Sequence, residues 1–432
     1  MSEAFKSAEA LQRAVGQLPA GALTTTRRKA AESFSQRGFP TTRQEDWRYT
    51  SLAPVAAIGE DWLQSERAQQ GEWPAPASEA LHDIMAEIDA TWIVLANGRV
   101  QFDASAATEE GVSIQRISEH ATAAQELRTD SPLEALNAAL LHDGIVIRVA
   151  RDVIARRPIG LLFFDDSDSE NSFSQARLLV EAGENSKLEL VELHYSQGAA
   201  AQASNVVSQF DLKTNSRIYV TRIVDRAAAH LHTGKVAVTV GQDAKFCYAG
   251  FDLGGALIRN DIEVNLAEPG ATVELNGLYL ASGKQHIDNH TRVDHRVGPS
   301  TSSEEYRGLL TGESKCVFNG KAIVHAGADG SDAQQANHNM LLSDRAEIDT
   351  KPELEIYADE VKCSHGATVG QLDQTALFYL RSRGLDRQTA MRMLTRAFAT
   401  KIVDSAPVAA ARDYLGLRTE ARLAEIVSGE PE

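Results

Sequence analysis

The sequence predicts a mainly β protein: a right-handed parallel β-helix (solenoid) core flanked by N-terminal and C-terminal helical domains. Apolar and polar residues alternate through most of residues 144–372, for instance in Lys187–Leu193 and Lys235–Val240, and this is the period of a β-strand. A similar phrase, a small or polar turn followed by an alternating strand, recurs at intervals of roughly 27 to 42 residues, the range of solenoid coils. Its turns lie near Gly183, Asn215, Gln242, Gly270, Gly312 and Asp344.

A single coil of this kind cannot bury its apolar face, so successive coils must stack. A parallel β-helix accommodates both the alternation and the irregular turn lengths. A β-sandwich with a similar number of strands is the competing architecture.

The N-terminal part of the chain is expected to be helical. Within residues 1–90, the segments Ser7–Leu18 and Thr26–Arg37 are rich in alanine, glutamate, glutamine and arginine, which favour helices. Residues 91–143 predict a small mixed α/β connecting region that begins with a short strand at Trp92–Leu95.

The helical period returns in residues 373–432. Asp373 is placed to cap a helix that starts at Gln374 and ends at Gly384, and Asp386 is placed to cap a second helix. We expect this C-terminal domain to cover the exposed strand edges at the end of the solenoid and to present its outer face to a partner. The second helix has an apolar stripe made of Ala390, Leu394, Ala397, Phe398 and Ile402.

Composition limits the classes of partner. The 432 residues are 43% hydrophobic and 24% charged, which suits a soluble globular chain with large cores. The formal charge of −17 opposes binding to nucleic-acid phosphates or anionic lipids. Met1–Ala10 has no cationic run followed by an apolar core, and no apolar segment reaches membrane-spanning length. We therefore expect a cytoplasmic protein that binds neither nucleic acid nor membrane.

The motifs of several enzyme classes are absent from the sequence. There is no Gly-x-x-x-x-Gly-Lys-Ser/Thr phosphate loop, so ATP hydrolysis is not assigned to this chain. A Gly-x-Ser-x-Gly elbow and a Gly-x-Gly-x-x-Gly dinucleotide fingerprint are also missing. We expect that the chain is not an enzyme and that any energy source belongs to a partner.

The pair Cys363 and His365 is the strongest chemical signal. Residues two apart on a strand share a face, so the thiol and the imidazole are expected to point the same way, with Cα atoms roughly 6.6 Å apart. Taken alone, such a pair is more often structural, a buried thiol beside a hydrogen-bonded ring.

The remaining cysteines and histidines favour structural roles. Three cysteines far apart in the sequence indicate no disulfide framework and fit a reducing compartment. Cys247 and Cys316 lie among strand-forming residues and are expected in the core. The spacing of His286 and His290 could chelate zinc, but in a solenoid hydrogen-bonded stacks of polar side chains are favoured over metal. The same expectation applies to His295, His230 and His232.

Several segments carry a resemblance to a known family. Lys351–Val361, running into Lys362–Gly370 and followed by Phe378–Gly384, closely resembles SufB/SufD proteins of the SUF iron–sulfur assembly system. Asp46–Thr50 and Asp288–His295 are similar to segments of the same family. The phrase Cys-Ser-His-Gly-Ala-Thr-Val-Gly resembles the SufD branch rather than SufB, and the resemblance spans the chain.

The resemblance implies a scaffold subunit with two protein partners. Such a chain pairs with SufB and binds the SufC ATPase through its C-terminal helices. The resemblance allows FADH2 on the assembled complex, and an exposed solenoid edge makes a homodimer of the isolated chain plausible. The residues expected to bind SufC are Phe378, Arg381, Arg383, Leu394 and Phe398. Without the family context, the two arginines would be read as a solvated helix face.

The resemblance also implies a transient iron–sulfur cluster shared with SufB. A cluster ordinarily takes about four protein ligands, mostly thiolates, whereas this chain has one cysteine beside a histidine and two other cysteines that are expected inside strands. Any cluster must therefore borrow ligands from another chain. By the resemblance, His365 is the expected metal ligand on this side, and Cys363 is the weaker candidate.

The alternative function is a carbohydrate-active β-helix enzyme, a lyase or hydrolase with paired carboxylates in a groove. Acidic residues are plentiful, but aromatic residues make up only 6% of the chain, whereas sugar grooves usually expose rings. The candidate carboxylates are Asp261, Glu263, Asp288 and Asp294.

Overall fold

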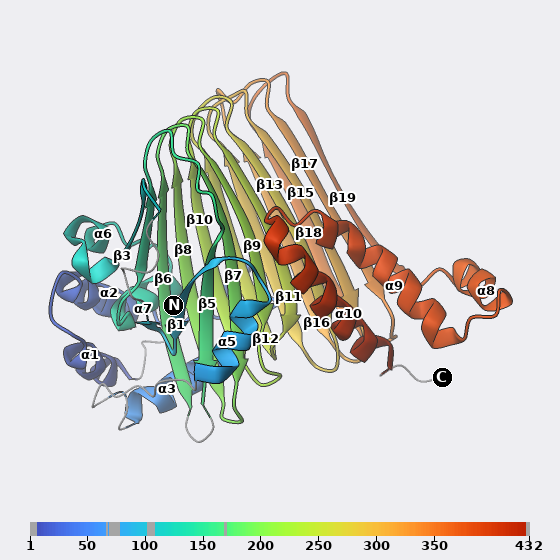
Figure 1. Ribbon diagram of the computed structural model, residues 1–432, viewed down its shortest axis with the longest axis horizontal. Coiled ribbons are helices and arrows are strands. Elements are labelled where there is room, and N and C mark those ends of the chain that lie inside the picture. The colour runs from blue at the N-terminus through green and yellow to red at the C-terminus, as the bar shows by residue number, and fades with distance from the viewer. Residues whose placement is uncertain (1–6, 66–67, 69–77, 102–108, 168–170, 429–432) are drawn as a thin grey trace.

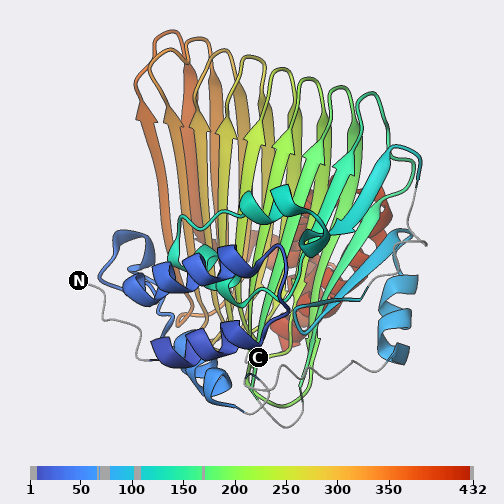
Figure 2. The same cartoon turned by 90° about the vertical axis from the view of Figure 1, so that its left-hand side faces the viewer.

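The computed structural model describes residues 7–65, 68, 78–101, 109–167 and 171–428. Two long sheets face each other, and a group of helices lies on the outer side of each (Figures 1 and 2). Within the solenoid, successive strands alternate between the sheets, so each coil contributes one strand to each sheet. The predicted mainly β solenoid between helical regions is confirmed, and the parallel pairing of its strands excludes the β-sandwich.

Sheet A is the ten-stranded sheet. Its strands are β1 (Thr91–Ala96), β2 (Arg99–Gln101), β5 (Ile159–Asp166), β7 (Lys187–Gln197), β9 (Arg217–Asp225), β11 (Lys245–Gly254), β13 (Thr272–Ala281), β15 (Thr301–Leu310), β17 (Asp332–Leu341) and β19 (Lys362–Gln371).

Sheet B is the nine-stranded sheet. Its strands are β3 (Val112–Arg116), β4 (Ile145–Val149), β6 (Ser172–Ala182), β8 (Gln202–Leu212), β10 (Leu231–Val240), β12 (Leu257–Leu266), β14 (His286–His295), β16 (Lys315–Val324) and β18 (Glu347–Ile356).

The space between the sheets, here called the lumen, is the main core. It is filled by alternate residues of both sheets, such as Val220 and Leu275 from sheet A and Ile258 from sheet B. Because paired strands in the coils run parallel and in register, residues at one register position form a row that runs along the solenoid and faces the same side.

The turns between coils use residues that tolerate a left-handed backbone. Asn185, Asn215 and Asp243 have φ near +55°, and Gly270 has φ +76°, a conformation favoured by asparagine, aspartate and glycine. Asn215 Nδ2 donates to Asn185 Oδ1 over 2.9 Å, and this ladder links successive coils. These positions coincide with the recurring turn phrase in the sequence.

The N-terminal helices other than α5 (Ser78–Ala86) cover the outer face of sheet B (Figure 2), whereas α5 packs against the outer face of sheet A through Leu81. Phe34, Trp62 and Leu136 from the helices pack with Phe173 and Leu257 from the sheet. The helical elements before the solenoid are α1 (Ala8–Gln17), α2 (Thr24–Arg37), η1 (Glu45–Trp47), α3 (Ala53–Gln64), α5 (Ser78–Ala86), η3 (Ile117–Glu119), α6 (Ala121–Gln125) and α7 (Pro132–Leu140).

The C-terminal helices begin as the sequence predicts. They are α8 (Gln374–Ser382), α9 (Arg387–Asp404), η4 (Ala409–Ala411) and α10 (Arg412–Ser428). Asp373 accepts hydrogen bonds from the backbone N–H groups of Thr375 and Ala376, and Asp386 accepts one from Thr389. Both predicted N-caps are therefore present.

The expectation that these helices cap the end of the solenoid is wrong. α9 packs on β13 and β15, and α10 packs on β11 and β13, along the outer face of sheet A (Figure 1). That face is apolar there, with Phe251, Leu280 and Leu309 fully buried under the helices, so it offers more surface to an apolar stripe than a strand edge does. The last strands of the two sheets, β18 and β19, are left uncovered.

Candidate functional site

Cys363 and His365 lie on β19, the last strand of sheet A. In register, Cys363 stands beside Ala333 of β17, and His365 stands beside Gln335. Ala333 and Gln335 are both buried in the lumen, so Cys363 and His365 belong to the lumen-facing side of the last coil. The thiol and the imidazole thus share a face, at the place where the lumen opens to solvent.

The last coil, made of β18 and β19, has a neighbouring coil on one side only, and its other side is open to solvent. β19 and β18 are the outermost strands of their sheets, His365 is exposed, and Cys363 is half-buried. Burial raises the pKa of the Cys363 thiol, so the isolated chain holds it as a thiol rather than a thiolate. Among the described residues, no group of three or more His, Cys, Asp or Glu side chains could hold a metal ion.

Glu304 and Gln335 extend the same row inward from His365. Glu304 of β15 is the register partner of Gln335, and Gln335 Nε2 donates to Glu304 Oε2 over 2.7 Å. Both side chains are buried, and they line a small cavity in the lumen together with Leu354 of β18. The sequence analysis missed both residues. Glu304 could have been found, because it shares a strand face with Ser302 and Tyr306, and an acidic residue on the inward face of a strand is unusual.

Glu304 makes the stability of the fold depend on pH. Burial raises its pKa from 4.5 to about 7, so between those values the folded chain holds a proton that the unfolded chain has lost. Raising the pH through this window therefore lowers the free energy of unfolding, by a loss on the order of 3 kcal/mol. The glutamine of Glu304→Gln does not titrate. We therefore expect the free energy of unfolding of this variant, relative to wild type, to rise by about that amount from pH 5 to pH 8 in urea unfolding. An equal difference at the two pH values would contradict this assignment.

The segments Asp46–Thr50 and Asp288–His295 meet in space. Thr50 Oγ1 hydrogen bonds to Asp288 and contacts His286 Nε2 at 2.7 Å. The guanidinium of Arg259 pairs with Asp288 and lies 4.3 Å from the centre of the Trp47 ring. Burial is the largest single influence and would raise the pKa of Asp288, but the charges of Arg259 and His290 and the hydrogen bonds from His290 and Thr50 together lower that pKa. These contacts hold the N-terminal segment against sheet B.

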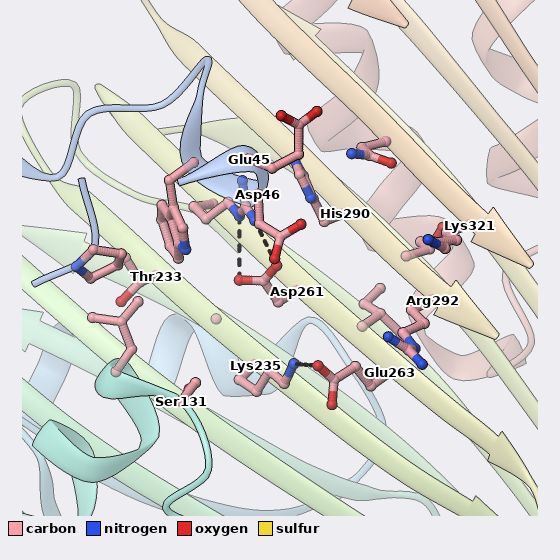
Figure 3. A pocket seen from close by; sticks show the side chains of 18 of the residues that line it. Glu45, Asp46, Ser131, Thr233, Lys235, Asp261, Glu263, His290, Arg292 and Lys321 are labelled. Atoms are coloured by element: carbon pink, nitrogen blue, oxygen red, sulfur yellow. Dashed lines mark hydrogen bonds and ion pairs between the residues drawn. The ribbon is translucent and has the colours of Figure 1, made fainter. Parts of the chain in front are cut away.

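A cavity of about 290 Å³ lies on the outer face of sheet B, under Glu45 and Asp46 (Figure 3). Its floor carries charges of both signs on neighbouring strands, and they pair with one another. Within the cavity, Lys235 pairs with Glu263 and Arg259 with Asp261. Arg292 also lines the cavity and pairs with Asp294 beside it. Asp288 also pairs with Arg259, so each of the four carboxylates considered for a carbohydrate enzyme lies in an ion pair, with Asp261 and Asp288 sharing one guanidinium.

The histidines and the other two cysteines lie in structural environments. His295 contacts the hydroxyls of Ser300 and Ser302, and Ser204 lies between His230 and His232 at 2.9 Å from each. Together with the contacts of His286 and the pair of His290 with Asp288, this agrees with hydrogen-bonded polar groups. Cys247 and Cys316 are buried, as expected.

The five residues expected to bind SufC divide into two groups. Phe378, Arg381 and Arg383 are exposed on and beside α8, which projects away from the solenoid (Figure 1). Leu394 and Phe398 are only partly exposed and pack against the chain's own hydrophobic clusters. These two side chains fix α9 in place and have little surface to offer a partner.

Comparison with known proteins connects this geometry to a family. Residues 164–398 match the model of the SufBD core domain of SUF system FeS cluster assembly, and residues 9–161 match the SufBD protein N-terminal region. The chain belongs to the SufBD family. It is 28% identical to the iron–sulfur cluster assembly protein SufD of Escherichia coli, over 87% of each chain.

Further SufBD family proteins are similar to this chain over most of its length. A SufBD family protein of Synechocystis is 28% identical over 91% of this chain and 89% of its own length. SufD of Bacillus subtilis is 26% identical over 66% of this chain and 65% of its own length. Family membership therefore favours iron–sulfur cluster assembly over the carbohydrate-active alternative. In the part of the chain that the structure describes, no helix has the length and apolar character to span a membrane.

Proposed function

We propose that this chain is the non-catalytic SufD-type scaffold subunit that pairs with SufB and completes a nascent iron–sulfur cluster site at their interface. The observation that carries the proposal is the position of His365 and Cys363, side by side on the lumen face of an uncovered last coil. An imidazole and a thiol are ligands that iron accepts. Two donors fall short of the about four that a cluster takes, so the remaining ligands belong to SufB.

The edges of β18 and β19 are the surface that SufB would cover. Uncovered parallel strands present unpaired N–H and C=O groups that invite another strand. Apolar side chains lie along this end, with Val369 51% exposed and Ile356 44% exposed. A partner solenoid with a similar open end would extend both sheets and enclose the lumen. When SufB is missing, the same edges suit a homodimer of this chain.

The C-terminal helices are the proposed docking site of the SufC ATPase. α8 is tethered to the solenoid through α9, which bonds directly to β15: Arg307 donates to the carbonyl of Phe398 over 2.9 Å, and Lys401 pairs with Glu305 over 2.7 Å. A displacement of these helices by SufC would therefore be transmitted to sheet A, two strands from β19. Such coupling requires two alternative arrangements of the SufB interface.

The chain's environment and cofactors follow from the same proposal. Its three cysteines are free thiols, consistent with a reducing cytoplasm. The cluster is cargo that the complex builds and releases. FADH2 stays an expectation for the assembled complex, because no feature of the described residues assigns a flavin site to this chain.

Co-purification with SufB and SufC tests the pairing. We expect Val369→Lys to weaken SufB binding about 30-fold or more, since it would bury an unpaired charge at the interface. Ile154→Lys is the matched control, because Ile154 is an exposed apolar residue (64%) between β4 and β5 in the first coil, far along the chain from the open end. Equal recovery of SufB with both variants would argue against the edge as the interface.

A further inference from the structure

A row of three lumen-facing residues ends at His365. In register, Glu304 of β15 stands beside Gln335 of β17, and Gln335 stands beside His365 of β19. Neighbouring strands are about 4.8 Å apart, so the Gln335 side chain is the next group behind the imidazole. Among the described residues, no strand pairs with the outer edge of β19, so the row of register partners ends at His365.

The Gln335 amide is held at one end only. Its nitrogen donates to Glu304, while its oxygen Oε1 is buried and has no hydrogen-bond partner. Across the lumen, a Cβ on Gly320 would stand only 2.1 Å from Gln335 Nε2, so glycine leaves the space that the amide occupies. A buried carbonyl oxygen without a hydrogen-bond donor is destabilising, so this position favours an incoming N–H group.

His365 can supply that N–H group. A histidine that binds metal through one ring nitrogen usually donates its other ring N–H to a carboxylate or a carbonyl, which fixes the tautomer and the ring orientation. Resting on the proposed role of His365 as a ligand, we propose that Gln335 is the positioning residue of His365, accepting its second ring N–H, and that Glu304 fixes the Gln335 amide with its oxygen free for this bond.

The test measures iron and acid-labile sulfide in the co-purified complex with SufB and SufC. Gln335→Met keeps the volume of the side chain but removes the acceptor, and we expect it to lower cluster content about 10- to 100-fold, the usual loss for an outer-shell partner. Glu304→Leu, which frees the amide, should also lower it. The conservative variant Glu304→Gln keeps a carbonyl acceptor for Gln335 and should stay within about threefold of wild type.

A matched control separates positioning from general disruption of the lumen. Tyr306→Phe removes a buried hydroxyl from the next lumen row, whose register partners are Asn337 and Ala367 rather than His365. We expect wild-type cluster content in this variant. All variants should recover SufB and melt within a few degrees of wild type.

A spectroscopic readout reports on the hydrogen bond itself. In a complex whose SufD-type chain carries ¹⁵N-histidine, pulsed EPR of the reduced cluster detects the remote ring nitrogen of His365, and its coupling should change in whatever cluster Gln335→Met retains. The positioning role would be overturned if Gln335→Met kept wild-type cluster content and an unchanged coupling. If the His365→Ala complex held no cluster in the same experiment, the proposed function would still stand. A fully loaded His365→Ala complex would instead overturn the proposed function.

Discussion

We expect His365→Ala to abolish iron–sulfur cluster assembly in cells while leaving the fold and SufB binding intact. The loss is large because the variant removes one of the about four ligands that a cluster takes. The fold should survive because His365 is exposed on an edge strand, where substitutions usually change stability by less than about 0.5 kcal/mol. Assembly is measured as the activity of a reporter iron–sulfur enzyme in cells that depend on this system.

Ser364→Ala is the matched control for His365→Ala. Ser364 lies on the same strand but points to the opposite face, where it hydrogen bonds to Gln334, so its loss should leave assembly unchanged. Cys363→Ala should reduce assembly less than His365→Ala does. Undiminished assembly in His365→Ala cells, with SufB still bound, would reject the ligand assignment.

Phe378→Asp is expected to remove binding of the SufC ATPase. Phe378 is 73% exposed on α8, and aromatic residues at the centre of an interface typically contribute 2 kcal/mol or more. An aspartate there would also bury an unpaired charge, so we expect affinity to fall at least about 30-fold in a pull-down or titration with purified SufC.

Two controls accompany Phe378→Asp. Ile154→Asp places the same charge at an exposed apolar residue (64%) outside the C-terminal helices and should leave SufC binding unchanged. Phe398→Asp should lower the melting temperature instead, because Phe398 packs in the cluster between α9 and sheet A and lies under the Arg307 guanidinium. Normal SufC affinity in a folded Phe378→Asp protein would show that SufC does not dock on Phe378.

The local features of this fold could be predicted from the sequence. Alternating residues in segments such as Lys187–Leu193 predicted strands, and the recurring turns predicted stacked coils. Both could be predicted because the period of a strand and the conformation of a turn depend on neighbouring residues. The caps Asp373 and Asp386 were predictable for the same reason. The choice of face for the C-terminal helices was not, since it depends on the apolar outer side of sheet A, which forms only once β11, β13 and β15 are aligned.

The candidate site was predicted only in part. Cys363 and His365 are two residues apart, so their shared face followed from strand geometry. The row that joins Glu304, Gln335 and His365 spans residues 30 or more positions apart and depends on the register between coils. The same limit applies to the contact between Thr50 and Asp288, which lie 238 residues apart in the sequence and which no local pattern connects.

The most direct test of the central claim is iron and sulfide analysis after reconstitution, with this chain alone and with its complex with SufB. The account predicts a stable, stoichiometric cluster only in the complex, and none when His365→Ala replaces the wild-type chain. A stoichiometric cluster held by the isolated wild-type chain on its own side chains would contradict it.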